Sequence, residues 1–126
     1  MTHSVVLLRA VNVGGRNRIA MADFRSLLER LGCMDVTTYV QSGNAVVSTR
    51  RSAASLQSAV VASLREELDL PVDVLVRTAD ELDAVVSANP FADEELAPTS
   101  VHAVFLDGPA PELPWRTVLA LQELAR

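Results

Sequence analysis

The order of short patterned segments in residues 1–78 restricts the fold more than any other feature of the sequence. Runs of β-branched and apolar residues predict strands, and apolar residues spaced three and four positions apart predict helices. Along this chain they predict a strand, a helix, two strands, a helix and a strand. The predicted segments are residues 4–11, 21–32, two arms within 36–49, 52–70 and 72–77. This order is typical of the ferredoxin-like βαββαβ fold, so we expect an α+β protein with one antiparallel sheet and both helices on one face.

An incomplete second α+β unit is predicted for residues 79–126, after the ferredoxin-like unit of residues 1–78. Thr78 and Glu81 have the spacing of a capping box, which marks the start of a helix. The predicted elements are a helix over 78–89, an acidic connector over 91–100, a strand over 101–107 and a helix over 115–126. A unit with so few strands would expose a sheet edge, and a homodimer would cover that edge.

Composition and charge argue against several classes of protein. The chain has 126 residues and a formal net charge of −5, and every basic side chain is arginine. This charge argues against nonspecific binding of nucleic acid over the whole surface. No apolar run approaches the roughly 20 residues that cross a bilayer, so we expect no membrane partner. The single cysteine, Cys33, cannot form an intrachain disulfide, and we expect a cytoplasmic protein.

Alternation along the predicted strands places an arginine in the middle of the sheet. Successive side chains of a strand point to opposite faces. The residues predicted beneath the helices are Val6, Leu8 and Val40. Those predicted on the opposite face are Arg9, Val11, Tyr39 and Gln41, together with Arg77. A guanidinium that is buried without a partner is costly. Arg9 therefore faces water, a carboxylate or a bound anion: it forms a salt bridge or packs over Tyr39, or else it belongs to a face that binds a ligand or a partner.

A glycine-rich loop joins the first predicted strand to the first predicted helix. It contains Asn12, Gly14, Gly15, Arg16 and Arg18. Glycines let the backbone approach another group closely, and the N–H groups at a helix start favour anions. The spacing nevertheless matches neither the P-loop nor the dinucleotide-binding pattern. The loop is thus either a structural corner or an anion site, and Asn12 either caps a turn or donates to a ligand.

The segment Ser42-Gly43-Asn44 lies between two alternating arms. Glycine and asparagine tolerate the left-handed conformations of tight hairpin turns, which is sufficient to explain this segment. In a ferredoxin-like sheet the third strand lies beside the first. We then expect the residues beside the turn to lie near one end of the first strand, and a role in ligand binding stays open.

Patterns that carry catalysis are weak in this chain. Cys33 follows a helix-ending glycine, and we expect it to be a small buried hydrophobic residue. Neither His3 nor His102 has a cysteine or carboxylate at metal-ligating spacing. The sequence therefore predicts no metal and no cofactor, and it favours a protein without enzymatic activity.

Two motifs, "LLRAVNVGG" (Leu7–Gly15) and "TYVQSGNAVVS" (Thr38–Ser48), resemble a known bacterial family. This is the DUF1697 family, a domain of unknown function whose members typically read LLRGINVGG and TYIQSGNVVF. The resemblance implies a small cytoplasmic α+β protein without an established activity, substrate or cofactor. Members usually run further at the C-terminus and look like two related halves. Ala10 stands where they carry glycine. The recurring family positions correspond to Arg9, Asn12, Gly14, Gly15, Tyr39, Gln41, Ser42, Gly43 and Asn44.

Three functions follow as hypotheses from these residues. The first is binding of a small anionic ligand, such as a nucleotide or phosphate, by the arginine–glycine loop and the polar sheet face. The residues predicted to bind it are Arg9, Asn12, Gly14, Gly15, Arg16, Arg18, Tyr39, Gln41, Ser42 and Asn44. The alternatives are a protein–protein or self-association module and an RNA-binding sheet face. The acidic charge and the single tyrosine make nucleic acid the less favoured partner.

Overall fold

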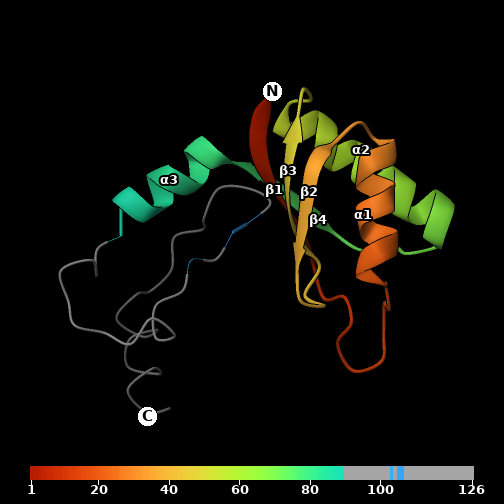
Figure 1. Ribbon diagram of the computed structural model, residues 1–126. Coiled ribbons are helices and arrows are strands. Elements are labelled where there is room, and N and C mark those ends of the chain that lie inside the picture. Colours follow the sequence, from red (N-terminus) through yellow and green to blue (C-terminus); the bar gives the residue numbers. More distant parts are fainter. Residues whose placement is uncertain (90–102, 104, 107–126) are drawn as a thin grey trace, which may run out of the picture.

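The computed structural model describes residues 1–89, 103, 105 and 106 of the chain. These residues form an α+β structure with a four-stranded sheet and three helices (Figure 1). In chain order the elements are β1 (Thr2–Leu8), α1 (Met21–Arg30), β2 (Met34–Tyr39), β3 (Asn44–Thr49), α2 (Ala53–Leu68), β4 (Val74–Thr78) and α3 (Ala79–Ser87).

The sheet is antiparallel, with the strand order β2-β3-β1-β4. The central strand β1 pairs with β3, where Val6 lies opposite Ala45, and with β4, where Val6 lies opposite Val76. All three side chains are buried, so this register aligns the apolar face of each strand. The outer strand β2 is irregular at its start, because the pairing with β3 shifts between Met34 and Thr37.

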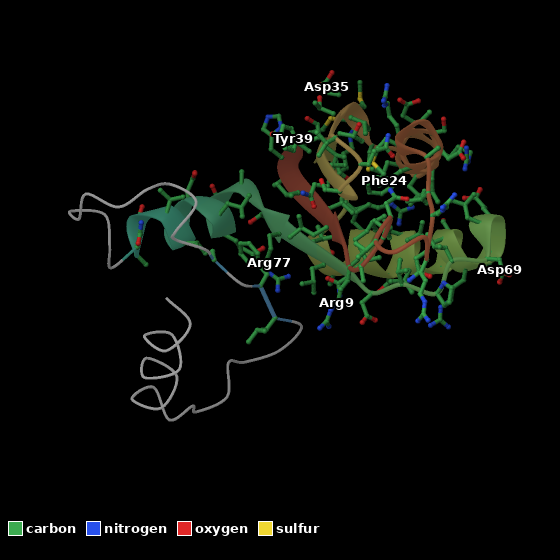
Figure 2. The ribbon with its side chains drawn as sticks, turned by 90° about the horizontal axis from the view of Figure 1, so that it is seen from below. Arg9, Phe24, Asp35, Tyr39, Asp69 and Arg77 are labelled. Carbon is green, nitrogen blue, oxygen red and sulfur yellow. The ribbon has the colours of Figure 1, made fainter. Side chains whose placement is uncertain are left out.

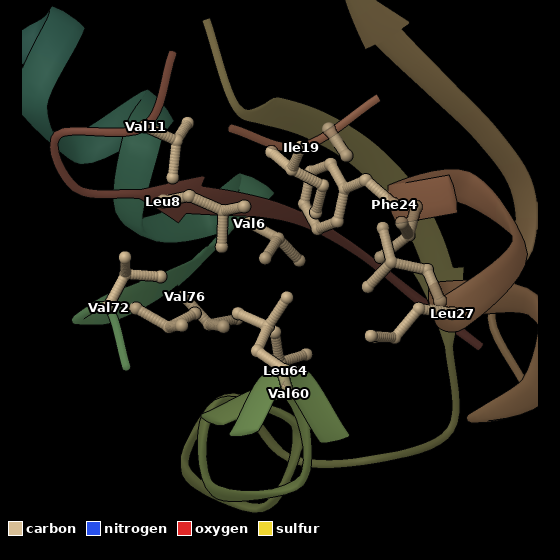
Figure 3. Packing of buried hydrophobic residues seen from close by; sticks show 14 of the residues in the cluster. Val6, Leu8, Val11, Ile19, Phe24, Leu27, Val60, Leu64, Val72 and Val76 are labelled. Atoms are coloured by element: carbon tan, nitrogen blue, oxygen red, sulfur yellow. The ribbon is translucent and has the colours of Figure 1, made fainter. Parts of the chain in front are cut away.

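Helices α1 and α2 cover one face of the sheet, as the sequence predicts (Figure 1). Phe24 and Leu27 of α1 and Leu64 of α2 are fully buried against β1 and its neighbours (Figure 3). Burial of one such side chain contributes about 1.5–3 kcal/mol relative to leaving it exposed. Burial of the apolar stripes of both helices is therefore the main interaction that holds these helices on the sheet.

The helix ends follow local sequence signals. Ser52 caps α2, since its side chain accepts a hydrogen bond from the Ser55 N–H. Thr78 and Glu81 form the predicted capping box at the start of α3. After α1 the chain turns at Gly32, whose φ of +87° suits glycine. The start of α1 is different, because its N-cap is Ala20 and carries no side-chain hydrogen bond.

Helix α3 lies on the other side of the sheet from α1 and α2 (Figure 1). It contacts β1 and β4, but none of its side chains is fully buried. The strand residues on that face are Val5 and Leu7 of β1 and Leu75 and Arg77 of β4, all of which are half-buried. This face is therefore less covered by the described residues than the face beneath α1 and α2.

Most strand ends differ from the prediction by one to three residues, and two of these differences move predicted face residues. β1 ends at Leu8, before Arg9 and Val11, because the chain turns into the left-handed region at Ala10, where φ is 55°. Val11 was predicted on the helix-free face, but it is 3% exposed and belongs to the core. Val40 was predicted beneath the helices, but it follows the end of β2 with a φ of 46° and is 64% exposed.

Several predicted elements lie outside the described residues. They are the connector over 91–100, most of the strand over 101–107 with His102, and the final helix from Trp115. Among the described residues, no helix is long and apolar enough to cross a membrane. The same residues hold no group of three or more potential metal-ligating side chains.

Candidate functional site

Asn12 organises the loop between β1 and α1. Its side-chain Nδ2 donates hydrogen bonds to the backbone oxygens of Ile19, at 3.0 Å, and Gln41, at 2.9 Å. Its Oδ1 accepts a hydrogen bond from the Ile19 N–H at 2.9 Å. The amide thus uses both donors and an acceptor on the backbone, and it ties the loop to the chain just after β2. Of the two predicted roles for Asn12, the turn-forming one is confirmed.

The turn between β2 and β3 packs on the end of β1. The Gly43 carbonyl accepts a hydrogen bond from the Leu8 N–H at 2.9 Å. A Cβ atom at Gly43 would lie 2.5 Å from Cγ2 of Val11 and 3.0 Å from Cβ of Leu8. Gly43 also has a φ of +77°. A side chain is therefore excluded here twice, by conformation and by space.

Ser42 and Asn44 shape the same turn. Ser42 Oγ donates to the Tyr39 carbonyl at 2.8 Å, and Asn44 Nδ2 donates to Ser42 Oγ at 3.0 Å. These bonds confirm the structural interpretation of the Ser-Gly-Asn segment. Asn12 and Gly43 together bring the two sequence motifs into contact at one end of the sheet.

An open hollow of about 480 Å³ lies beside this junction. Its lining residues are Asn12, Gly15, Arg18, Ile19, Ala20 and Gln41. The side chain of Arg18 passes over Gly15, since Nη2 of Arg18 lies 3.5 Å from the position of a Cβ on that glycine. The φ of Gly15 is +74°, a left-handed conformation, and the Arg18 guanidinium lies next to the position that a Cβ atom would occupy.

The start of α1 borders the hollow and attracts negative charge. Ala20 provides no capping side-chain oxygen, and the N–H groups of Met21, Ala22 and Asp23 bond to no residue that the structure describes. The helix dipole adds positive potential at this end. Arg16 and Arg18 form no ion pair within residues 1–89. The Asp23 carboxylate lies in the first turn and offsets part of this potential.

The structure brings together four of the ten predicted binding residues, which are Asn12, Gly15, Arg18 and Gln41. Gln41 follows the end of β2 and lines the hollow, so its predicted place on the helix-free face was wrong. The other six do not line this hollow. They are Arg9, Gly14, Arg16, Tyr39, Ser42 and Asn44. Gly14 and Arg16 lie in the turn closed by the hydrogen bond from Arg16 N–H to the Val13 carbonyl.

Arg9 and Tyr39 are far apart, at the β4 and β2 sides of the molecule (Figure 2). Arg9 follows β1 instead of standing in its middle, and its N–H donates to the Asp73 carbonyl at 3.0 Å. Its Nη1 lies 3.8 Å from Oδ2 of Asp73, and the two side chains are 75% and 81% exposed. The predicted packing of Arg9 over Tyr39 was therefore wrong. Tyr39 is 73% exposed, and it shares the face opposite α1 and α2 with its pairing partner Asn44.

Sequence reasoning missed a contact between His3 and Ser48. His3 is part of β1 opposite Ser48, and its Nδ1 lies 3.1 Å from the Ser48 Oγ. Within the described residues no carboxylate is hydrogen-bonded to the imidazole, so the pair lacks the third member of a catalytic triad. Only the strand register could have revealed this contact, because the two residues are 45 positions apart.

Cys33 has the predicted character of a buried hydrophobic residue. It is 4% exposed and part of the core. Burial raises the pKa of the Cys33 thiol above its ordinary value, against smaller opposing effects of a hydrogen bond with Thr49 and the charge of Arg51. The protonated thiol is therefore the stable form at neutral pH, which argues against a nucleophilic role.

Comparison with solved structures finds a protein of similar fold. It is similar to a conserved bacterial protein of Streptococcus pneumoniae of known structure, with a TM-score of 0.65 and 22% sequence identity. The similarity covers 97% of this chain and 66% of the other, so the chain spans about two thirds of that relative's length. At this identity the similarity concerns the fold alone. No match was found among curated proteins.

Comparison with family models finds a match over the region that contains both motifs, which meet at Asn12 and Gly43. The model for the protein family of unknown function DUF1697 matches residues 1–124. That match extends over nearly the whole chain and includes both the glycine loop and the hairpin turn. The chain belongs to the DUF1697 family.

Proposed function

We propose that the protein binds a small anionic ligand in the hollow beside α1, with inorganic phosphate or the phosphate group of a nucleotide as the ligand class. One observation carries this proposal: Arg18 and the uncapped start of α1 border the same hollow. A guanidinium and free backbone N–H groups are complementary to phosphate oxygens.

The rigidity of the loop supports the proposal. Asn12 binds both Ile19 and Gln41, so the loop and the segment after β2 are held in place before any ligand arrives. A preorganised site loses less conformational entropy on binding. The Gln41 side chain forms no hydrogen bond within the described residues, and it would supply a neutral donor or acceptor.

Thermal-shift and calorimetric titrations with phosphate, pyrophosphate and ADP test this proposal. We expect a dose-dependent rise in Tm, and we expect Arg18→Gln to abolish it. Arg25→Gln is the matched control, because Arg25 is an exposed arginine of α1 that does not line the hollow. A missing stabilisation by all three anions, or an equal loss in the two variants, would contradict the proposal.

We further propose that residues 1–78 form a ferredoxin-like unit and that residues 79–126 belong to a second α+β unit. The βαββαβ order of elements and the antiparallel strand order β2-β3-β1-β4 support the first part. The separate capping box of α3 and its position across the sheet from the other helices support the second (Figure 1).

Self-association is a second candidate function, and a specific observation favours it. Apolar and aromatic side chains at the β2 side of the sheet are unusually exposed: Met34 at 53%, Tyr39 at 73% and Val46 at 49%. Met34 and Tyr39 belong to the outer strand β2, whose outer edge pairs with no described strand. RNA binding on this face stays a prediction, with Tyr39 as its one aromatic side chain on β2 and β3.

A further inference from the structure

A second cleft, separate from the hollow beside α1, lies along the outer side of β4. Its volume is about 510 Å³. The described residues that line it come from β1 and the turn after it, from α2, from β4 and the residue before it, and from residues 103, 105 and 106. They are Leu7, Leu8, Arg9, Gln57, Val61, Asp73, Val74, Leu75, Ala103, Phe105 and Leu106. This volume is within the range of small-molecule sites.

The walls of this cleft are formed by apolar side chains that are only half-buried. Leu7, Leu75, Val61 and Phe105 are each half-buried. Arg77 binds one of the residues in this wall, since Nη2 of Arg77 donates to the Leu106 carbonyl at 2.6 Å. The Arg77 guanidinium also lies 5.7 Å from the centre of the Phe105 ring, which is a cation–π distance. Figure 2 shows Arg77 close to this wall.

Side chains occupy part of the outer edge of β4, at Val76 and Thr78. The Val76 N–H donates to Oε1 of Gln57, and the Val76 carbonyl accepts from Nη1 of Arg77. The Thr78 N–H donates to Oε1 of Glu81. Since side chains occupy these backbone groups, an extended peptide cannot pair with this stretch of β4. The cleft therefore suits a compact ligand.

The rim of the cleft carries one charge of each sign. Arg9 and Asp73 both line the cleft, and their closest charged atoms are 3.8 Å apart. That separation is long for a charge-assisted hydrogen bond, so the two groups do not satisfy each other. The backbone bond between Arg9 N–H and the Asp73 carbonyl keeps their main chains together. A guanidinium and a carboxylate thus stand side by side beside an apolar wall.

We propose that this cleft binds an α-amino acid with a large apolar side chain. Its carboxylate would pair with Arg9 and its ammonium group with Asp73. The side chain would cover Leu7, Leu75 and Phe105. The opposite charges of an α-amino acid are separated by one carbon atom, which matches the adjacency of Arg9 and Asp73. This site is independent of the anion site proposed beside α1, since the two clefts share no lining residue.

Titration of the ¹⁵N-labelled protein with L-phenylalanine, followed by NMR, tests the proposal. We expect saturable shifts of the amide signals of Arg9, Val61 and Leu75. Three analogues separate the contributions: 3-phenylpropionate lacks the ammonium group, phenethylamine lacks the carboxylate, and glycine lacks the apolar side chain. Each should bind more weakly than L-phenylalanine.

Variants that remove the charge of Arg9 or Asp73 test the proposed pairing of these residues with the amino acid. Arg9→Gln and Asp73→Asn should each weaken L-phenylalanine binding about two- to fivefold, which is the range for exposed charge pairs. Both side chains are exposed, so the fold should persist, and the unperturbed spectrum checks this. Arg18→Gln, in the other hollow, is the control and should leave the affinity unchanged. The absence of saturable shifts would overturn the proposal. Binding of 3-phenylpropionate and phenethylamine as tight as that of L-phenylalanine would also overturn it, and so would an affinity that neither variant changes.

Discussion

At the scale of single residues, Asn12 and Gly43 explain why the two motifs occur in one chain. Asn12 contributes three hydrogen bonds to the backbone of the loop and of the segment after β2. Gly43 lets the hairpin turn approach Val11 and Leu8 more closely than any other residue would. The spacing of the glycines and asparagines predicts turns, but not that these turns touch each other. That contact depends on the pairing of β1 with β3, whose residues are more than thirty-five positions apart.

Replacement of Gly43 should be far more destabilising than replacement of another glycine with positive φ. We expect Gly43→Ala to lower the free energy of unfolding by about 2–4 kcal/mol, from the left-handed conformation and the overlap with Val11. Gly14→Ala is the control: φ there is +61°, but no atom lies within 4 Å of the added Cβ. It should lower the free energy of unfolding by about 1–2 kcal/mol. Urea denaturation measures both, and equal losses would show that the close packing of Gly43 is unimportant.

At the scale of elements, the two outer strands of the sheet differ. The edge of β4 is occupied by side chains of Gln57, Arg77 and Glu81. The edge of β2 has a pairing irregularity near Asp35, where φ is 52°, and the strand exposes Met34 and Tyr39. Sequence patterns predicted which segments are strands. They could not predict which strands are outermost, because strand order depends on contacts between distant segments.

If β2 and its face mediate self-association, loss of the exposed apolar side chains should weaken it. We expect the double variant Tyr39→Ser/Val46→Thr to raise the dimer dissociation constant about tenfold or more, because aromatic anchors dominate interfaces. Multi-angle light scattering over a concentration series measures this. Val86→Thr on α3 removes a comparably exposed apolar residue, 72% exposed, and should have no effect. A wild-type protein that stays monomeric at all concentrations would refute self-association.

At the scale of the whole molecule, one core holds the sheet to α1 and α2 (Figure 3). Cys33 belongs to this core. The raised pKa of this thiol links the stability of the fold to pH. Below the pKa of the unfolded thiol, about 8.5, both states are protonated and the thiol does not change the balance between them. Above that value the unfolded state loses its proton first, so it binds fewer protons than the folded state and is favoured.

The free energy of unfolding should therefore fall as the pH rises from about 8.5 toward the higher pKa of the folded thiol. Chemical denaturation at pH 7 and at alkaline pH measures the change. Cys33→Ala has no thiol, and its stability should decline less over this interval than that of the wild type, even though it starts lower because of the cavity. Parallel declines in the two proteins would mean that the thiol contributes nothing to the pH dependence.

Within residues 1–89 the sequence by itself determined the kinds of elements and their approximate bounds, because helix stripes, capping residues and turn glycines act within a few positions. It also identified the Ser-Gly-Asn hairpin turn and the buried state of Cys33. Tertiary structure alone decided that Arg9 lies beside Asp73, that Gln41 joins Asn12 and Arg18, and that Val11 is buried. The physical reason is that left-handed residues at Ala10 and Val40 end the strands early. Past those points side-chain directions follow long-range packing instead of strand alternation.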